Sequence, residues 1–242
     1  MFHQPLRQTE GLLRSIVDVL GVDIAIPDHT TLSRRSGGLT ILLKRLDRAE
    51  PLHLLVDSTD LKIYGEGEWL DHGIRSRRRW RKLHLGVDAV TREIVAMELT
   101  SDDVRDVSEI PILLDQIDTD VASMTADGAY DADAVYDAVA ERHPEATMII
   151  PPRPSAVPSE TMTTPRDQHI VEIEKHGRIG RQRRSGYNQR SLVETAMYRY
   201  KSIVGWRLHA RALSNQRIAA KIGDNVLNRM TGLGMPASTR IR

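Results

Sequence analysis

The stretch LHLLVDSTD, residues 52–60, is the part of the sequence from which the fold can best be inferred. Its nearly continuous apolar run predicts a short central strand that is covered on both faces. Asp57 comes where that run stops, so we expect its carboxylate at a sheet edge, open to a ligand. The stretch VASMTADGAYD, residues 121–131, repeats the pattern, with a strand-like run that ends at Asp127. Two strand ends therefore each present an acid.

The stretch YNQRSLVETAMYRYK, residues 187–201, adds a third acid on a predicted helix. At about 100° per residue, four polar residues fall within an arc of roughly 60°: Tyr187, Arg190, Glu194 and Lys201. The opposite side of this helix is apolar, as a helix packed on a core requires. Taken alone, the polar side also fits a solvated helix face with an ordinary Arg190–Glu194 pair.

Three carboxylates from two strand ends and one helix are the donor set of a divalent metal site. Mg²⁺ prefers oxygen ligands and usually takes only one or two protein carboxylates per ion. Two such ions, about 3.5 to 4 Å apart, can activate the attacking oxygen and stabilise the leaving oxygen in a displacement at phosphorus. The sequence contains no cysteine, which excludes disulfides and thiolate metal sites.

At these residues the chain resembles the DDE transposases of the bacterial insertion-sequence-five family. The resemblance rests on the YREK pattern of residues 187–201 and on four further stretches: VDSTDLKIYGEGEW, RRRWRKLHLGVD, TADGAYD and NRMTGLGMP. It implies an α/β fold of the ribonuclease H-like (retroviral-integrase-like) type, a mixed sheet flanked by helices, with a small N-terminal helical segment. It also implies an N-terminally truncated copy, because full-length relatives carry more residues before the segment that begins here.

The resemblance assigns roles to individual residues. It implies that Asp57, Asp127 and Glu194 are catalytic and bind two Mg²⁺ ions per active site, with Mn²⁺ tolerated. It implies that Tyr187, Arg190 and Lys201 hold the DNA backbone beside these ions. Asp60 departs from the family, whose members often have a small residue at this position. If the strand continues, Asp60 lies on the face opposite Asp57, so we keep Asp57 as the ligand.

Basic residues are concentrated in two stretches, although the net charge is only +1. GIRSRRRWRK precedes a predicted hairpin, and KHGRIGRQRRSGYNQR leads into the YREK helix and is expected to be a mobile loop. Local clusters of cations attract phosphates whatever the net charge. The predicted DNA contacts are Arg77, Arg78, Arg79, Arg81, Lys82, Arg183 and Arg184. The alternative for either stretch is a solvated surface.

The predicted organisation has three parts. Residues 1–48 form an N-terminal helical segment that resembles a remnant of a DNA-binding helix-turn-helix, with a simple packing appendage as the alternative. Residues 49–235 form the catalytic domain, with a loop insertion at about 151–185 where Pro, Ser and Thr are frequent. Residues 236–242 are a tail. Trp206 lies in the stretch SIVGWRLHARAL, and we expect it to pack in the core. The alternative for Trp80 or Trp206 is contact with a base flipped from the DNA end, as in some related transposases.

The predicted function is metal-dependent cleavage and strand transfer at insertion-sequence ends. The partners would be terminal inverted repeats and target DNA, with a homodimer pairing the two ends. No apolar run is long enough to span a bilayer, and we expect a cytoplasmic, nucleoid-associated protein. Two alternatives stay open: a nuclease of the same fold that cuts without joining, and an inactive DNA-binding remnant that inhibits an intact transposase.

Overall fold

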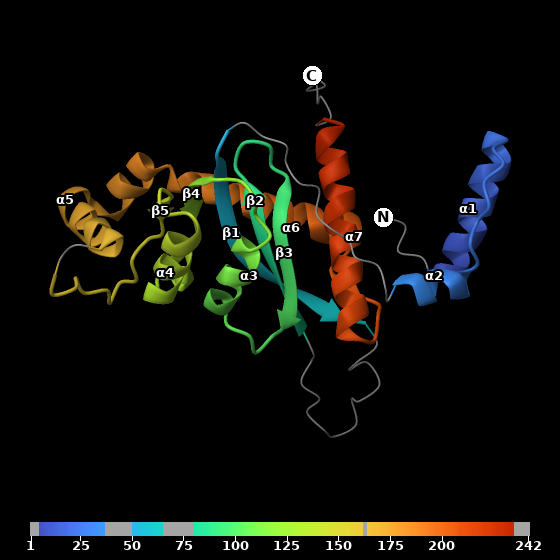
Figure 1. The fold of residues 1–242 in the computed structure, drawn as a ribbon, viewed down its shortest axis with the longest axis horizontal. Coiled ribbons are helices and arrows are strands. Elements are labelled where there is room, and N and C mark those ends of the chain that lie inside the picture. Colours follow the sequence, from blue (N-terminus) through green and yellow to red (C-terminus); the bar gives the residue numbers. More distant parts are fainter. Residues whose placement is uncertain (1–4, 37–49, 65–79, 162–163, 235–242) are drawn as a thin grey trace, which may run out of the picture.

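The computed structural model describes residues 5–36, 50–64, 80–161 and 164–234. The elements in chain order are α1 (Leu6–Leu20), α2 (His29–Ser36), β1 (Leu52–Ile63), β2 (Trp80–Asp88), β3 (Ile94–Ser101), η1 (Asp106–Glu109), α3 (Ile110–Leu114), β4 (Val121–Thr125), η2 (Gly128–Tyr130), α4 (Asp133–Arg142), β5 (Thr147–Ile149), α5 (Pro165–Ser185), η3 (Tyr187–Arg190), α6 (Ser191–Arg199), η4 (Tyr200–Val204), β6 (Arg207–Leu208) and α7 (Leu213–Gly232). Figure 1 shows them as a central sheet with helices around it.

The sheet is mixed, with the strand order β3-β2-β1-β4-β5. β1, β2 and β3 form an antiparallel meander, whereas β4 and β5 run parallel to β1. Short helices connect the parallel strands, as parallel pairing requires. This order, with helices on both faces, confirms the predicted ribonuclease H-like fold.

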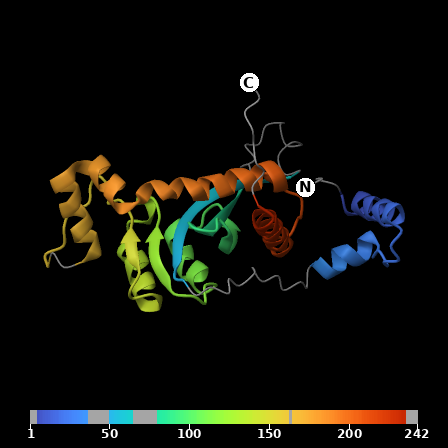
Figure 2. The ribbon, with the colours of Figure 1, turned by 90° about the horizontal axis from the view of Figure 1, so that it is seen from above.

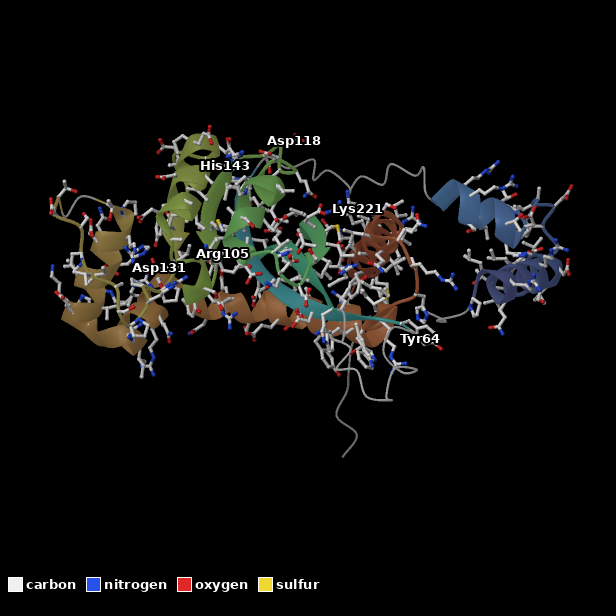
Figure 3. All side chains as sticks on the ribbon, turned by 90° about the horizontal axis from the view of Figure 1, so that it is seen from below. Tyr64, Arg105, Asp118, Asp131, His143 and Lys221 are labelled. Carbon is white, nitrogen blue, oxygen red and sulfur yellow. The ribbon has the colours of Figure 1, made fainter. Side chains whose placement is uncertain are left out.

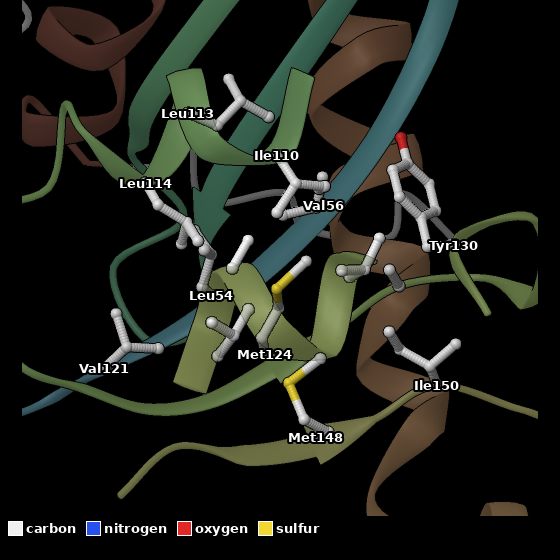
Figure 4. Close-up of a cluster of buried hydrophobic side chains, with 14 of the residues drawn as sticks. Leu54, Val56, Ile110, Leu113, Leu114, Val121, Met124, Tyr130, Met148 and Ile150 are labelled. Carbon is white, nitrogen blue, oxygen red and sulfur yellow. The ribbon is translucent and has the colours of Figure 1, made fainter. Parts of the chain in front are cut away.

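Two buried clusters lie on opposite faces of the sheet. Side chains alternate along β1, so Leu54 and Val56 enter one cluster and Leu55 and Leu61 the other. The first cluster, drawn in Figure 4, is covered by α3 and α4. The second is covered by α6 and α7, which Figure 2 shows on the opposite side of the sheet. The sheet is therefore the middle of three layers, and residues of β1 with odd numbers face α6.

β1 continues well past Asp57, so the prediction that the strand stops there was wrong. Apolar residues return in the second half of the strand, where Leu61 and Ile63 are buried. What does change near Asp57 is the neighbouring strand. β4 pairs with β1 as far as Leu55, and β6 pairs with it again only at Lys62. Asp57 thus lies in a part of β1 that pairs with β2 on one side. On the other side, β4 has already ended its pairing and β6 has not yet begun.

The loop insertion expected at residues 151–185 is helical over its second half. α5 begins at Thr164, which forms a capping box with Asp167, and extends to Ser185. The helix contains a break at Gly177, whose φ of 70° and ψ of 165° are not helical. Glycine adopts this backbone readily. The basic approach to Tyr187 is therefore a broken helix and was wrongly expected to be a loop.

The YREK segment is built from three kinds of helix, where a single α-helix was expected. Tyr187–Arg190 is a 3-10 turn, Ser191–Arg199 is α-helical, and Tyr200–Val204 is a π-helical turn. The predicted apolar face is confirmed, since Val193, Ala196 and Tyr200 are buried. Regular spacing of about 100° per residue therefore holds only in the middle of the segment.

The N-terminal helices form a pair that Figures 1 and 2 show apart from the sheet. α1 ends at Leu20 and is capped by Gly21, whose φ of 62° is left-handed. Asp28 caps α2 by accepting a hydrogen bond from the amide of Thr31. Within the parts of the chain described, no helix is both long and apolar enough to cross a membrane. The predicted tail, residues 236–242, lies outside the described residues.

Candidate active site

Asp57 and Asp127 are brought together by the parallel pairing of β1 and β4. Leu55 and Thr125 are directly paired. Asp57 follows Leu55 by two residues and Asp127 follows Thr125 by two, so both acids come just after the end of the paired segment. Because alternate residues of β1 share a face, Asp57 points toward the α6 side together with Leu55 and Leu61.

Glu194 is brought to the same place by α6 and is linked to Asp57 by Arg190. One guanidinium nitrogen of Arg190 lies 2.8 Å from Oδ2 of Asp57, and the other lies 2.5 Å from Oε1 of Glu194. The side chains of Asp57 and Arg190 are 16% and 23% exposed, whereas that of Glu194 is 52% exposed. The arginine therefore bridges a half-buried acid on the central strand and an open acid on the helix.

The carboxylate of Asp57 is affected by its burial and by neighbouring charges. Burial raises the pKa of Asp57, while the backbone amide of Ser58 and the guanidinium of Arg190 act to lower it. The charges of Asp127 and Glu194 act to raise it. Asp57 is therefore the acid of the three that is joined to Glu194 through Arg190 and is also affected by the charge of Asp127.

Asp127 is fixed by the short turn that follows β4. Its carboxylate accepts a hydrogen bond from the amide of Ala129. Arg153 closes the same turn from outside, donating to the carbonyl oxygens of Gly128 and Ala129 at 3.1 and 3.0 Å. The sequence analysis did not identify Arg153, because an arginine in a Pro-rich stretch gives no signal of its distant partner. It is a positioning residue for the Asp127 turn.

The other predicted site residues lie at different distances from these acids. Tyr187 is near the bridge, with its ring centroid 6.0 Å from the guanidinium carbon of Arg190. Lys201 lies in the π-helical turn that follows α6. Asp60 is exposed on β1 and pairs across the sheet with Lys82. Because β1 continues beyond it, Asp60 belongs to the face opposite Asp57.

The predicted basic contacts fall into three groups. Arg183 and Arg184 are exposed at the end of α5. Arg81 donates to the side chain of Gln216, and Lys82 lies 3.2 Å from a carboxylate oxygen of Asp106. These two cations thus have partners within the fold. Arg77, Arg78 and Arg79 lie outside the described residues.

The donor set suits hard divalent ions, although the acids do not form a closed metal cage. Among the described residues, no three acidic or histidine side chains are grouped tightly enough to count as a metal-binding cluster. The guanidinium of Arg190 holds one oxygen of Asp57 and one of Glu194. Carboxylate oxygens suit a hard divalent ion, which would compete with Arg190 for these oxygens of Asp57 and Glu194.

Comparison with known proteins agrees with this arrangement. A family model described as "Transposase DDE domain" matches residues 48–223, and a second model with the same description matches residues 1–66. The crystal structure of the Mos1 mariner paired end complex with Mn is 11% identical, covering 96% of this chain and 76% of that one, with a TM-score of 0.29. The Mos1 strand transfer complex is 12% identical, covering 95% and 72%, with a TM-score of 0.27.

The two structural likenesses are weak, as their TM-scores of 0.29 and 0.27 indicate. The match to the family model carries more weight in assigning a family, because it is a match of sequence over residues 48–223. It spans most of the 242 residues and includes all three acids of the site. The chain belongs to the transposase DDE domain family, whose function is DNA transposition.

Proposed function

We propose that this chain cleaves DNA at insertion-sequence ends and joins the freed end to target DNA. The observation that carries the proposal is the bridge from Asp57 to Glu194 through Arg190. Asp57 lies 133 positions from Arg190 in the sequence, and Glu194 lies 4 positions from it. Asp127 extends the same group, since its charge acts on Asp57. Membership of the insertion-sequence-five family is part of the proposal and rests on the YREK pattern.

Asp57, Asp127 and Glu194 would hold two divalent ions, Mg²⁺ or Mn²⁺. Such ions, when bound, activate the attacking oxygen and stabilise the leaving oxygen of a displacement at phosphorus. The half-buried position of Asp57 on the central strand keeps its carboxylate fixed, while the exposed Glu194 lies on the side from which DNA can approach.

The cations of the YREK segment would hold the DNA backbone beside the acids. Arg190 has a planar guanidinium that can bind a phosphate through two nitrogens, and the ring of Tyr187 lies beside it. Lys201, Arg183 and Arg184 would add contacts that depend on charge and carry no sequence information. Recognition of terminal repeats by α2, a homodimer on DNA and a cytoplasmic location belong to the same proposal.

A strand-joining assay tests this function. Purified protein is mixed with Mg²⁺ or Mn²⁺, a plasmid, and a pre-nicked duplex that carries the repeat flanking its gene. We expect joining by the wild type and by Asp60→Asn, and loss of joining in Glu194→Gln. Joining that survives Glu194→Gln, or that is lost in Asp60→Asn, would show that the acids are wrongly assigned.

The outcome without joining is also informative. If wild type and Glu194→Gln both cut the duplex but neither joins it, the acids are not essential and the proposal fails. If wild type cuts without joining and Glu194→Gln does neither, the chain is a nuclease that lacks strand transfer. Binding without either reaction would favour the inhibitory DNA-binding remnant.

A further inference from the structure

The far end of β1 carries cations stacked on aromatic rings. The guanidinium carbon of Arg207 lies 4.6 Å from the centroid of the Trp206 ring and 5.9 Å from that of Tyr64. Nζ of Lys62 lies 5.8 Å from the Trp206 ring. The rings of Tyr64 and His209 lie 4.8 Å apart at an interplanar angle of 32°. We call Lys62, Tyr64, Trp206, Arg207 and His209 the aromatic–basic cluster.

Strand pairing explains why these side chains lie together on the surface. β6 is parallel to β1, with Lys62 opposite Arg207 and Ile63 opposite Leu208. Ile63 and Leu208 are both buried, so their neighbours in each strand point the other way. Tyr64 is 52% exposed and Trp206 is 44% exposed. The expectation that Trp206 packs in the core was therefore wrong.

The aromatic–basic cluster is separate from the acid centre. Asp57 precedes Lys62 on β1 by five residues, or about 17 Å at the rise of an extended strand. It also belongs to the other face of β1, together with the buried Ile63. Figure 3 shows Tyr64 far from Asp131, which follows the Asp127 turn. A ligand of this cluster would thus be held by residues that do not take part in the acid centre.

Lys62 and Arg207 differ from Arg190 in their partners. Within the described parts of the chain, neither Lys62 nor Arg207 forms an ion pair with a carboxylate, whereas Arg190 bridges two acids. Cations without a carboxylate partner among the described residues, beside exposed rings, suit a nucleic acid strand, because bases stack on the rings and phosphates meet the cations. A duplex hides its base faces, so the match is to an unpaired strand.

We propose that the aromatic–basic cluster binds a single-stranded segment of DNA, with bases stacked on Tyr64 and Trp206 and backbone phosphates held by Lys62 and Arg207. The choice of DNA rests on the proposed function, whereas the choice of an unpaired strand rests on the exposed rings. The cluster would hold an unpaired strand at a distance from the acid centre.

Fluorescence anisotropy with a labelled oligothymidine of about 15 nucleotides tests the proposal, with EDTA present so that no metal-dependent step contributes. We expect Tyr64→Ala and Trp206→Ala each to weaken binding about tenfold, since one stacked base is lost. Tyr64→Phe keeps the ring and is expected to bind like the wild type. The matched control is Tyr198→Ala, which removes a tyrosine that is 72% exposed on α6.

Thermal unfolding of each variant shows whether an affinity loss is merely structural. Unchanged affinity in folded Tyr64→Ala and Trp206→Ala would overturn the proposal and leave this face to a protein partner. An equal loss for a blunt duplex would overturn the stacking role of the rings. Failure of the proposed function would appear differently, as strand binding by the cluster in a protein that neither cuts nor joins DNA.

Discussion

The sheet and the N-terminal helix pair are stabilised in opposite ways. Around the sheet, two clusters of buried side chains cover both faces of β1. In α1 no residue is buried, and Val19 and Leu20 are 86% and 68% exposed. α1 and α2 are joined by polar contacts, in which Glu10 accepts hydrogen bonds from His29 at 2.9 Å. Chemistry that needs fixed side chains therefore belongs to the sheet, whereas the helix pair is held mainly by polar contacts.

The largest expected difference between these regions is in the cost of removing a leucine side chain. Leu54 is fully buried on β1, so we expect Leu54→Ala to lower the free energy of unfolding by about 3 kcal/mol. The matched variant Leu20→Ala removes the same atoms from an exposed position, and we expect a change below about 0.5 kcal/mol. Urea unfolding measures both values. Equal losses would show that α1 is packed as tightly as the sheet.

His84 makes the stability of the sheet region depend on pH. Burial lowers the pKa of His84 to about 4, although Asp106 acts to raise it. The unfolded chain therefore takes up a proton below about pH 6.5 that the folded chain does not. We expect stability to fall by roughly 2 kcal/mol between pH 7 and pH 5 through this residue. The difference between wild type and His84→Gln isolates it, and an unchanged difference across this range would contradict the assignment.

Asp224 is expected to destabilise the region around the sheet. It is fully buried on α7, and neither of its carboxylate oxygens has a hydrogen-bond partner among the described residues. Burial raises the pKa of Asp224 well above the usual value. The folded chain therefore loses stability as the pH rises above the pKa of an ordinary aspartate, because the buried carboxyl group resists giving up its proton. We expect Asp224→Asn to raise the free energy of unfolding by about 1 to 2 kcal/mol at pH 7. Destabilisation at pH 7 would point to an undetected partner of the carboxylate.

Arg190 provides the smallest test, at the acid centre itself. An ion that binds Asp57 and Glu194 must displace its guanidinium, so Arg190→Ala is expected to bind Mn²⁺ about fivefold more tightly, or about 1 kcal/mol. Lys201→Ala is the matched control, because it removes a positive charge of the same YREK segment without removing the bridge. Titration calorimetry measures both. An equal gain in the two variants would mean that charge alone, and not the bridge, governs binding.

The sequence singled out Asp57, Asp127 and Glu194 because each combines a carboxylate with a recognisable local pattern, and their role as a catalytic site stays a prediction. Parallel pairing places the two aspartates just after the paired residues Leu55 and Thr125. The end of β1 was missed because Asp57, Ser58 and Thr59 interrupt the apolar run before Leu61 and Ile63 resume it. Such an interruption has the same appearance as a strand end.

Other features depend on contacts that a local pattern does not contain. The capping box of Thr164 and Asp167 signals the start of α5, but the glycines after it suggested a loop. The roles of Arg153 and of Arg207 depend on partners tens of residues away. Trp206 seemed apolar in sequence, yet its neighbours Arg207 and Lys62 lie over its ring at the surface.

The most direct test of the acid centre is divalent-ion binding, measured by titrating Mn²⁺ into the wild type, Glu194→Gln and Asp60→Asn. Glu194 and Asp60 are both exposed acids, but only Glu194 is joined to Asp57 through Arg190. We expect Asp60→Asn to bind Mn²⁺ like the wild type and Glu194→Gln to bind it at least about tenfold more weakly, because a carboxylate ligand is lost. Equal affinity in all three proteins, or a loss only in Asp60→Asn, would contradict a metal centre formed by Asp57, Asp127 and Glu194.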